Sequence, residues 1–427
     1  MKTILKVFGV IFGLLLVLCI GAVLYISTLD PNDYKAQIAE SFYEETGRSL
    51  TIDGDIAISI YPWLGLEINR VTVGNAAGFG DQPFFQADHA MLRVKLMPLL
   101  REQYEVDTVR LHGAIINLQK NPEGITNWAD LAGGAAESDR ASDSAGLPLA
   151  AVILGGVDIR DANLSWDDQS TGVRYDINNL VMTTGELIYG QPIDVNMTLQ
   201  ASANKPEIAA DVGLAGTINY EPGRSALAIS PLQLTTTLTG PNVPDGTADV
   251  VLTTAIAVNL DDETLSVSDL DFTALGTRLS GTVNATNIRS STPSWQSQLT
   301  LAGTDLSVLF KLAEIEPLAT QLAGMADRSF DLTAAVDADM EGGDLEISGL
   351  DANLLGSNIR GDIQAANIQT STPIIRGTLN GTGPDLPALM QVAGQLQGGS
   401  DATLTRYGRQ LGRVSGRNFV VDINFDA

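Results

Sequence analysis

The sequence predicts a mainly β fold, in which an N-terminal transmembrane helix precedes an elongated, repetitive antiparallel β-sheet body. This body is expected to be a curled, groove-like stack with a few short helices. Three observations predict it: residues 7–26 form an uncharged apolar run, later segments alternate apolar and polar residues, and residues 270–309 recur at 350–389. Alternation with period two is typical of strands with one dry and one wet face, and repeated strand units indicate a stack.

Composition and charge narrow the class of protein. The chain has 427 residues, of which 44% are hydrophobic, so wholesale disorder is excluded. It carries 25 Lys plus Arg against 51 Asp plus Glu, and only Lys2 and Lys6 precede the first acid, Asp30. After residue 29 there are therefore 25 − 2 = 23 bases against 51 acids. Such a body repels phosphate backbones, which disfavours nucleic acid as a partner; the simplest reading of the acidity is solubility.

The sequence offers no catalytic or metal-binding pattern. The single Cys19 forbids an intrachain disulfide framework, and His89 and His112 are expected to be isolated, which excludes a histidine-based metal cluster. GxSxG, HExxH, Walker A and CxxC motifs are all missing, and glycine-rich 74–81 is expected to be a loop. The acidic pairs Asp53/Asp55 and Asp261/Asp262 are expected to be solvated turn residues. We therefore expect no enzymatic activity, no cofactor and no metal.

Residues 7–26 have the length of a membrane span, because twenty helical residues extend ~30 Å. Lys2 and Lys6 on one side and the acidic body on the other place residues 1–6 in the cytoplasm and the body across the membrane. A cleaved signal peptide is the alternative, but its apolar core is shorter and ends at a small-residue site, whereas this run ends in LYIST. The residues expected to anchor the chain are Val7, Phe8, Leu14, Leu15, Leu16, Ile20 and Tyr25.

A short amphipathic helix is expected over 30–47. Asp30 can cap it, Pro31 suits its first position, and Gly47 can provide the left-handed residue at its end. An apolar stripe at helical spacing is formed by Tyr34, Ile38 and Phe42.

Beyond this helix the period changes to that of strands. Alternation is visible in 51–68 and 105–118 and is regular in 193–201. Turn residues such as Asp53-Gly54, Asp261-Asp262 and Gly342-Gly343 separate the strands. Two segments break the pattern: 133–146 has the composition of a flexible acidic loop, and 305–326 is helical with a break near Pro317.

An internal repeat organises the second half of the chain. Residues 270–309 align without gaps to 350–389, with 16 identities in 40 positions. A third copy is expected to begin at 417–427, which resembles 328–338. Repeated strand units bury their faces against their neighbours, and the sheet edge at 427 would be open. We expect either a C-terminally shortened chain or an edge that another molecule extends.

The N-terminal third carries several specific motifs. They are DPNDYK at 30–35, GR.LTI.GDI at 47–56, the YPWLG turn at 61–65, NA.GFG at 75–80, K.MPLL at 95–100 and G.TNW.DL at 124–131. Together they resemble the AsmA family of envelope proteins, strongly to residue 131 and weakly beyond. The resemblance implies an inner-membrane anchor, a periplasmic β-rich body and a role in outer-membrane biogenesis and envelope lipid homeostasis. Compared with the family, the chain is expected to be short at its C-terminus.

The family is also grouped with bridge-like lipid transfer proteins, which implies that phospholipid acyl chains lie along an apolar β groove. An open sheet with one dry face would suit this, whereas a closed sheet stack would use the same residues as its core. The candidate groove-lining residues are Ile193, Val195, Met197, Leu199, Ile359, Ile363 and Ala365. The alternative function is a non-transporting β scaffold that affects assembly or targeting of outer-membrane proteins by contact, with an envelope protein as a partner at the C-terminal sheet edge.

The expected organisation follows the chain. Residues 1–6 are cytoplasmic, 7–27 are the anchor, 28–132 form the AsmA-like α+β region, 133–146 the loop, 147–250 a β-rich region, 251–330 and 331–410 two β repeats, and 411–427 the start of a third repeat or the C-terminal edge.

Overall fold

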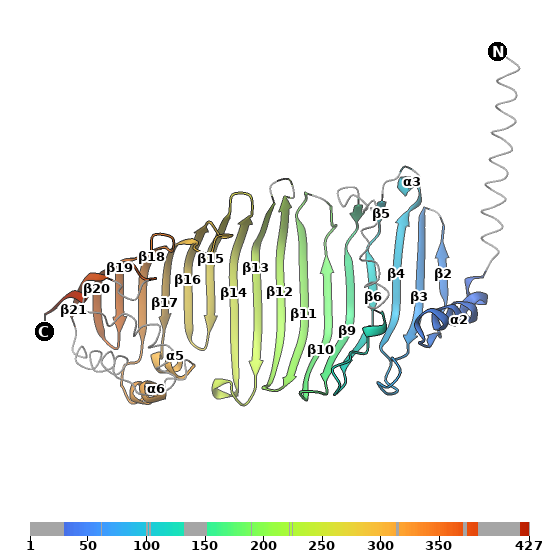
Figure 1. Ribbon diagram of the computed structural model, residues 1–427, viewed down its shortest axis with the longest axis horizontal. Coiled ribbons are helices and arrows are strands. Elements are labelled where there is room, and N and C mark those ends of the chain that lie inside the picture. Colours follow the sequence, from blue (N-terminus) through green and yellow to red (C-terminus); the bar gives the residue numbers. More distant parts are fainter. Residues whose placement is uncertain are drawn as a thin grey trace, which may run out of the picture. The chain divides into compact units, whose positions relative to one another are not determined.

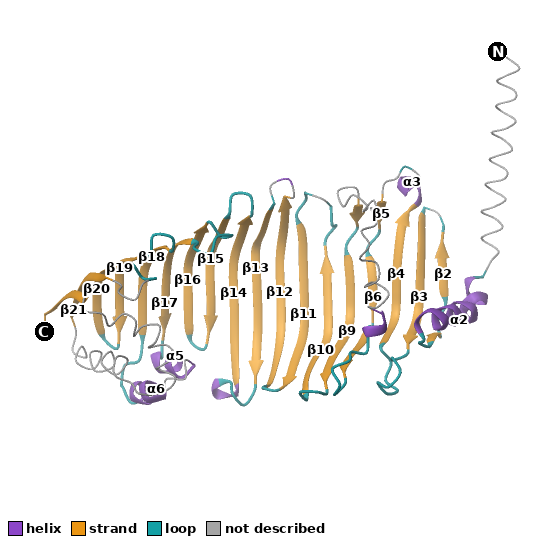
Figure 2. Cartoon of the chain, in the orientation of Figure 1, coloured by secondary structure: helices purple, strands orange, loops and turns teal. Residues whose placement is uncertain are grey.

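The structure is a computed structural model in which most of the described residues are in strands, with few short helices (Figures 1 and 2). It describes residues 30–60, 62–99, 101, 104–131, 152–188, 190–221, 223, 225–312, 316–369, 374–382 and 419–426. The chain divides into two compact units, unit 1 (Met1–Asn179) and unit 2 (Leu180–Ala427). The mainly β, mostly antiparallel fold expected from the sequence is confirmed.

Unit 1 opens with the expected helix, which is confirmed. It consists of η1 (Pro31–Tyr34) followed by α2 (Lys35–Thr46), the Asp30 carboxylate accepts a hydrogen bond from the Asn32 amide, and Gly47 ends the helix at φ 70°. The stripe at helical spacing is not a packed face, because Tyr34 and Ile38 are exposed. The helical segment is attached by polar contacts instead: the Asn32 side chain accepts from the Ile56 amide and donates to the Ile56 carbonyl.

The strands of unit 1 include those expected within 51–68 and 105–118 and several others. They are β1 (Leu50–Ile52), β2 (Ile56–Ser59), β3 (Trp63–Val73), β4 (Phe85–Lys95), β5 (Tyr104–Val106), β6 (Val109–His112), β7 (Ile115–Lys120), β8 (Val152–Leu154), β9 (Val157–Asp168) and β10 (Val173–Thr184), which reaches into unit 2, with α3 (Leu96–Leu99) after β4. Strand β3 pairs antiparallel with β1, β2 and β4.

Three pairs in unit 1 depart from the antiparallel expectation. β5 pairs with β8, and β6 and β7 pair with β9, all in parallel. Parallel pairs need a long connection, which the segment between residues 120 and 152 provides. Period-two alternation indicates which face of a strand is dry but not the direction of the neighbouring strand. The parallel pairs could therefore not be predicted from the sequence pattern.

Unit 2 is a succession of strands in which neighbours in the chain are neighbours in the sheet. They are β11 (Ile193–Asn204), β12 (Glu207–Glu221), β13 (Ala226–Thr239), β14 (Thr247–Asn259), β15 (Thr264–Ala274), β16 (Thr277–Thr286), β17 (Ser294–Gly303), β18 (Phe330–Asp339), β19 (Asp344–Leu354), β20 (Ser357–Ala366), β21 (Ile374–Thr382) and β22 (Phe419–Asp426), with η4 (Pro244–Gly246) before β14. Each pair from β11 to β21 is antiparallel, whereas β22 runs parallel to β21.

The sequence repeat corresponds to a repeat of backbone geometry. Strands β15 and β16, displaced by 80 residues, have the bounds of β19 and β20. The left-handed residues recur in the same register, since Leu275 at φ 51° matches Leu355 at 53°, and Asn287 at 56° matches Asn367 at 58°. The repeated residues therefore specify the bulges and turns as well as the strands.

The predicted helical segment 305–326 is also confirmed and is divided before Pro317. It forms α5 (Leu306–Leu312) and α6 (Glu316–Ala323) between β17 and β18. Leu322 of α6 is fully buried together with Leu355 of the β19–β20 turn, and Leu306, Phe310 and Met325 pack against them. The helices thus cover one end of the neighbouring strands, at the lower side of β17 in Figure 1.

The predicted anchor and the predicted loop 133–146 lie outside the described residues. Among the helices that the structure does describe, none has the length and apolar character needed to cross a membrane.

Candidate functional site

The alternation in β11 produces two chemically distinct faces. Ile193, Val195, Met197 and Leu199 are half-buried, while the residues between them are exposed. Across the β11–β12 pair, Met197 lies opposite Leu214 and Leu199 opposite Val212. All four predicted residues of this strand therefore share one face.

Cross-strand register extends this face through unit 2 as continuous rows. The row that contains Met197, here called the central row, crosses ten strands from β11 to β20. Its members, each opposite the next, are Met197, Leu214, Leu234, Leu252, Phe272, Leu279, Leu301, Leu332, Ala352 and Ile359. Every member is apolar, and the row ends on Ile359, one of the residues singled out in the sequence.

Two further rows of the same face contain three more candidates, Ile193, Ile363 and Ala365, while Val195 and Leu199 lie between the rows on β11. The second row joins Ile193 to Ile363 and consists of Ile193, Ile218, Ile229, Ile256, Val267, Val283, Ser297, Val336, Ile347 and Ile363. The third, here called the rim row, consists of Tyr220, Leu227, Val258, Leu265, Ala285, Trp295, Ala338, Leu345 and Ala365. The structure brings all seven predicted residues, from β11 and β20, to one apolar face.

The opposite face is polar in the same register. Gln233 lies opposite Thr253, Thr253 opposite Asp271, and Asp271 opposite Ser280. Further along, the Thr300 and Thr333 hydroxyls are 2.9 Å apart, and Arg360 forms an ion pair of 3.0 Å with Asp351. One face of unit 2 thus suits water and the other suits hydrocarbon.

The apolar face is only partly covered by the protein. In the described residues of β11, β12 and β13, no side chain is fully buried, and nine members of the central row are half-buried while Ala352 is 2% exposed. A closed core would bury Leu and Phe side chains of such a row completely. The face is therefore open to a ligand over these strands, and its surface provides apolar contact with few hydrogen-bonding groups.

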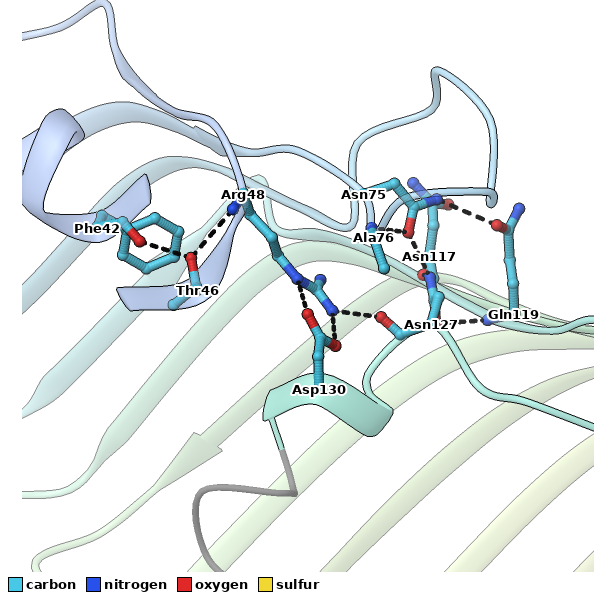
Figure 3. A network of polar contacts seen from close by, with 9 residues as sticks. All are labelled: Phe42, Thr46, Arg48, Asn75, Ala76, Asn117, Gln119, Asn127 and Asp130. Carbon is cyan, nitrogen blue, oxygen red and sulfur yellow. Dashed lines mark hydrogen bonds and ion pairs between the residues drawn. The ribbon is translucent and has the colours of Figure 1, made fainter. Parts of the chain in front are cut away.

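A buried polar network occupies a separate place, in unit 1 (Figure 3). Arg48 is 1% exposed; its Nε donates to Asp130 Oδ2 at 2.9 Å, and its Nη2 donates to Asp130 Oδ1 and to the Asn127 carbonyl. The guanidinium also lies 4.7 Å from the centre of the Phe84 ring. Its hydrogen bonds lower the pKa of the Asp130 carboxyl.

The network continues through the fully buried Asn127. Its side chain donates to Asn75 Oδ1 and to the Asn117 carbonyl and accepts from the Gln119 amide. Arg48, Asn75, Asn127 and Asp130 all belong to the specific motifs of the N-terminal third. Neither a nucleophile nor a base is poised here, so these motifs fix the loop 74–81 and the turn near Trp128 to the sheet. The centres of the Trp128 and Trp166 rings lie 5.3 Å apart.

The two histidines are not isolated in the fold, and the sequence-based description of them was wrong in this respect. Strands β4 and β6 place His89 opposite His112, with ring centres 5.3 Å apart. His89 Nε2 is 3.1 Å from Glu67 Oε1, and His112 Nε2 is 3.6 Å from Asp158 Oδ2. A separation of 23 residues hides this contact because only strand register creates it. Within the described residues, no three His, Cys, Asp or Glu side chains are arranged to hold a metal ion.

A hollow of about 480 Å³ lies beside the polar side chains of β18 to β21. Asp337, Glu346 and Arg376 line it together with Leu345 and Ala365 of the rim row, and the Glu346 carboxylate accepts a hydrogen bond from Gln364. Its lining mixes charged and apolar side chains and lies at one edge of the apolar face, which extends over many more strands. The apolar face is the stronger candidate site.

Comparison with known proteins indicates one family. The model of the AsmA family matches residues 1–374. Protein AsmA of Escherichia coli (strain K12) is 23% identical over 320 residues, which cover 70% of this chain and 47% of that protein. The chain thus spans about half the length of the curated relative that it matches. No solved structure matches.

Proposed function

Because this chain belongs to the AsmA family, we propose that it is an envelope protein that takes part in outer-membrane biogenesis and lipid homeostasis. In this proposal residues 7–26 anchor it in the inner membrane, with the N-terminus cytoplasmic and the body periplasmic. The apolar face of unit 2 holds phospholipid acyl chains and conducts them along the rows. The chemistry is binding and movement, not bond formation, and it needs no cofactor.

The physical basis is that hydrophobic contact has no direction. Each CH₂ group removed from water contributes ~0.8 kcal/mol, whichever apolar side chain covers it. In the central row Leu, Phe, Met, Ile and Ala follow one another at the strand spacing of ~4.8 Å. A chain that leaves one contact gains an equivalent one at the next strand, so the free energy along the row is nearly flat.

The observation that carries this proposal is the central row itself, ten apolar residues in register with nine of them half-buried. A rigid scaffold that acts through protein contacts has no need of an open apolar face that is continuous over ten strands. The scaffold function is the alternative, and the experiment must distinguish it from lipid conduction.

The test uses the full chain with a protease site inserted between Leu29 and Asp30. After purification the body is released from the membrane, and its bound lipid is identified and counted by mass spectrometry. We expect stoichiometric phospholipid in the native protein and its loss in the double variant Val195→Asp/Met197→Asp, because a carboxylate on the apolar face is costly to desolvate beside an acyl chain.

The matched control is Thr198→Asp, on the same strand but on the exposed, polar face. It should keep its lipid, and circular dichroism should show that all variants remain folded. A folded native body without lipid would refute conduction and favour the scaffold. Unfolding of Val195→Asp/Met197→Asp, with Thr198→Asp intact, would identify these residues as closed core.

A further inference from the structure

The two ends of the apolar face differ in how much water reaches them. At one end lie the large exposed apolar side chains Tyr220, Leu227, Leu260 and Trp295, which are 48%, 42%, 46% and 37% exposed. Three belong to the rim row, and Leu260 follows the last residue of β14. Among the described residues of unit 2 the remaining exposed large apolar side chain is Val251, which lies on the polar face opposite Thr235.

The opposite ends of the later strands are covered by protein. Phe330 is 4% exposed at the start of β18, Leu355 is 1% exposed in the β19–β20 turn, and Leu322 of α6 is fully buried against it. The α5–α6 hairpin lies at this end, at the lower side of Figure 1. A hydrated headgroup has no access to these positions, because their contacts are already made by the protein.

Tyr and Trp are the side chains that suit a boundary between hydrocarbon and water, since each joins a large apolar ring to one polar group. Tyr220 and Trp295 stand at such a boundary, between the second row and the turns at the strand ends. The turn after Leu260 contains Asp261, Asp262 and Glu263. A polar, water-exposed group is thus expected above the rim row and hydrocarbon below it.

The depth of the face fits this orientation. In β14 Val258 of the rim row lies six positions beyond Leu252 of the central row, about 20 Å at ~3.3 Å per residue. One leaflet of a bilayer provides roughly 15 Å of hydrocarbon, half of the ~30 Å core. An acyl chain that begins at the rim row therefore ends close to the central row.

We propose that the rim row is the headgroup side of the site: a bound phospholipid places its headgroup over the strand ends that carry Tyr220, Leu227, Leu260 and Trp295. Its acyl chains then run along the strands toward the central row, and the end with the α5–α6 hairpin receives no headgroup. This inference rests on the proposed function, which it makes specific by giving the lipid one orientation.

Strand β13 provides an internal ruler for the test, because Leu227, Leu234 and Leu238 lie on its apolar face in that order from the rim. The full chain is reconstituted in vesicles that contain phosphatidylethanolamine with a photoreactive diazirine either on the headgroup or at the acyl terminus. A zwitterionic headgroup is chosen because the acidic turn would repel a net negative one. After irradiation, labelled residues are mapped by mass spectrometry.

We expect the headgroup probe to label the neighbourhood of Leu227 about tenfold more than that of Leu238, the ratio that a preference of about 1.4 kcal/mol gives. The acyl-terminal probe should label near Leu234 and Leu252. Val251 and Gln233, on the polar face, are the internal controls and should stay unlabelled by the acyl-terminal probe.

Equal headgroup labelling at Leu227 and Leu238, or headgroup labelling near Leu355, would overturn the assigned orientation. If the acyl-terminal probe still labelled the central row in that case, lipid binding itself would remain supported. Absence of acyl labelling on the whole apolar face, with the protein folded, would instead refute the proposed function. A peptide or second copy on the face would leave both probes excluded from it, and light scattering would reveal the added mass.

Discussion

At the scale of single residues, the motifs that make the N-terminal third recognisable have a structural purpose. Arg48 is buried and uses its guanidinium to hold Asp130 and the Asn127 carbonyl, two groups that follow it by about 80 residues. Buried charges persist only where they are paired and hydrogen-bonded. The most specific sequence motifs of this protein therefore mark a stabilising polar network within unit 1. The proposed site, in contrast, consists of ordinary Leu, Ile and Val residues.

The first prediction concerns this polar network. Asp130→Asn removes the negative charge but keeps the shape, and it leaves the buried Arg48 uncompensated. We expect a loss of about 3 kcal/mol in the free energy of unfolding of unit 1. Hydrogen exchange of the β3 and β4 amides is the measurement.

The control for this experiment is Arg174→Gln, which breaks an ion pair whose Arg side chain is 54% exposed. It should cost less than about 1 kcal/mol, because water screens exposed pairs. If Asp130→Asn were as mild as this control, the network would not stabilise the unit.

Acid should also weaken unit 1 through Asp168. Hydrogen bonds from Ser170, and then Lys120 at 3.2 Å, lower the pKa of this carboxyl to about 2. The ordinary value of an unfolded Asp is about 3.9, so the unfolded chain takes up this proton first as the pH falls. The stabilisation is complete above pH ~4 and is lost between about pH 4 and pH 2.

The prediction is that Asp168→Asn lowers the melting temperature at pH 7 and that this difference from the native protein shrinks steadily below pH 4. Asp81→Asn, at an exposed position of the loop 74–81, should leave the melting temperature unchanged at either pH. A difference that stayed constant down to pH 2 would mean that the carboxylate charge contributes nothing.

At the scale of elements, the repeat determines more than strand positions. Gly281 adopts φ 141°, and a Cβ placed there would collide with the Gln298 carbonyl; at the equivalent Gly361 it would collide with the Thr378 carbonyl. Two strands approach so closely at both sites that only glycine fits. The repeat therefore conserves the points of close approach along with the apolar rows.

We predict that Gly281→Ala destabilises unit 2 by about 2 kcal/mol, from strain and collision together. Gly223→Ala, where nothing lies near the added Cβ, should stay within about 0.5 kcal/mol of the native protein. Urea unfolding followed by tryptophan fluorescence would report both. A mild effect of Gly281→Ala would show that the two paired strands can move apart at this point without loss of stability.

Elements were predictable from the sequence where the signal was local. The cap at Asp30, the left-handed Gly47 and the break before Pro317 are each encoded within a few residues. The parallel pairs of β9 and the contact of His89 with His112 were not, because they depend on which distant segments become neighbours. Alternation could place Ile193 and Ile363 on dry faces, but only the register shows that they lie in one row.

At the scale of the whole molecule, the question is whether the apolar face works as one path or as separate binding positions. The central row has no polar member between Met197 and Ile359. Because the strands follow one another in chain order, movement along the row passes every strand in turn. A path of this kind has a kinetic signature that independent positions lack.

The last prediction uses that signature. Leu214→Asp and Leu332→Asp each introduce a charge into the central row at distant strands, β12 and β18. A charge among hydrocarbon costs about 2.5–3.5 kcal/mol, so each variant should slow phospholipid transfer between vesicles about a hundredfold. Two equal barriers in series only double the resistance, so the double variant should be slower than either single one by about twofold. Val251→Asp, on the polar face, should transfer at the native rate. If the positions were independent, each variant would lose only the lipid bound near its own substitution, and the double variant would lose the sum of the two amounts. Transfer through the unchanged positions would continue in each single variant. That outcome would mean that the face stores lipid locally and does not conduct it.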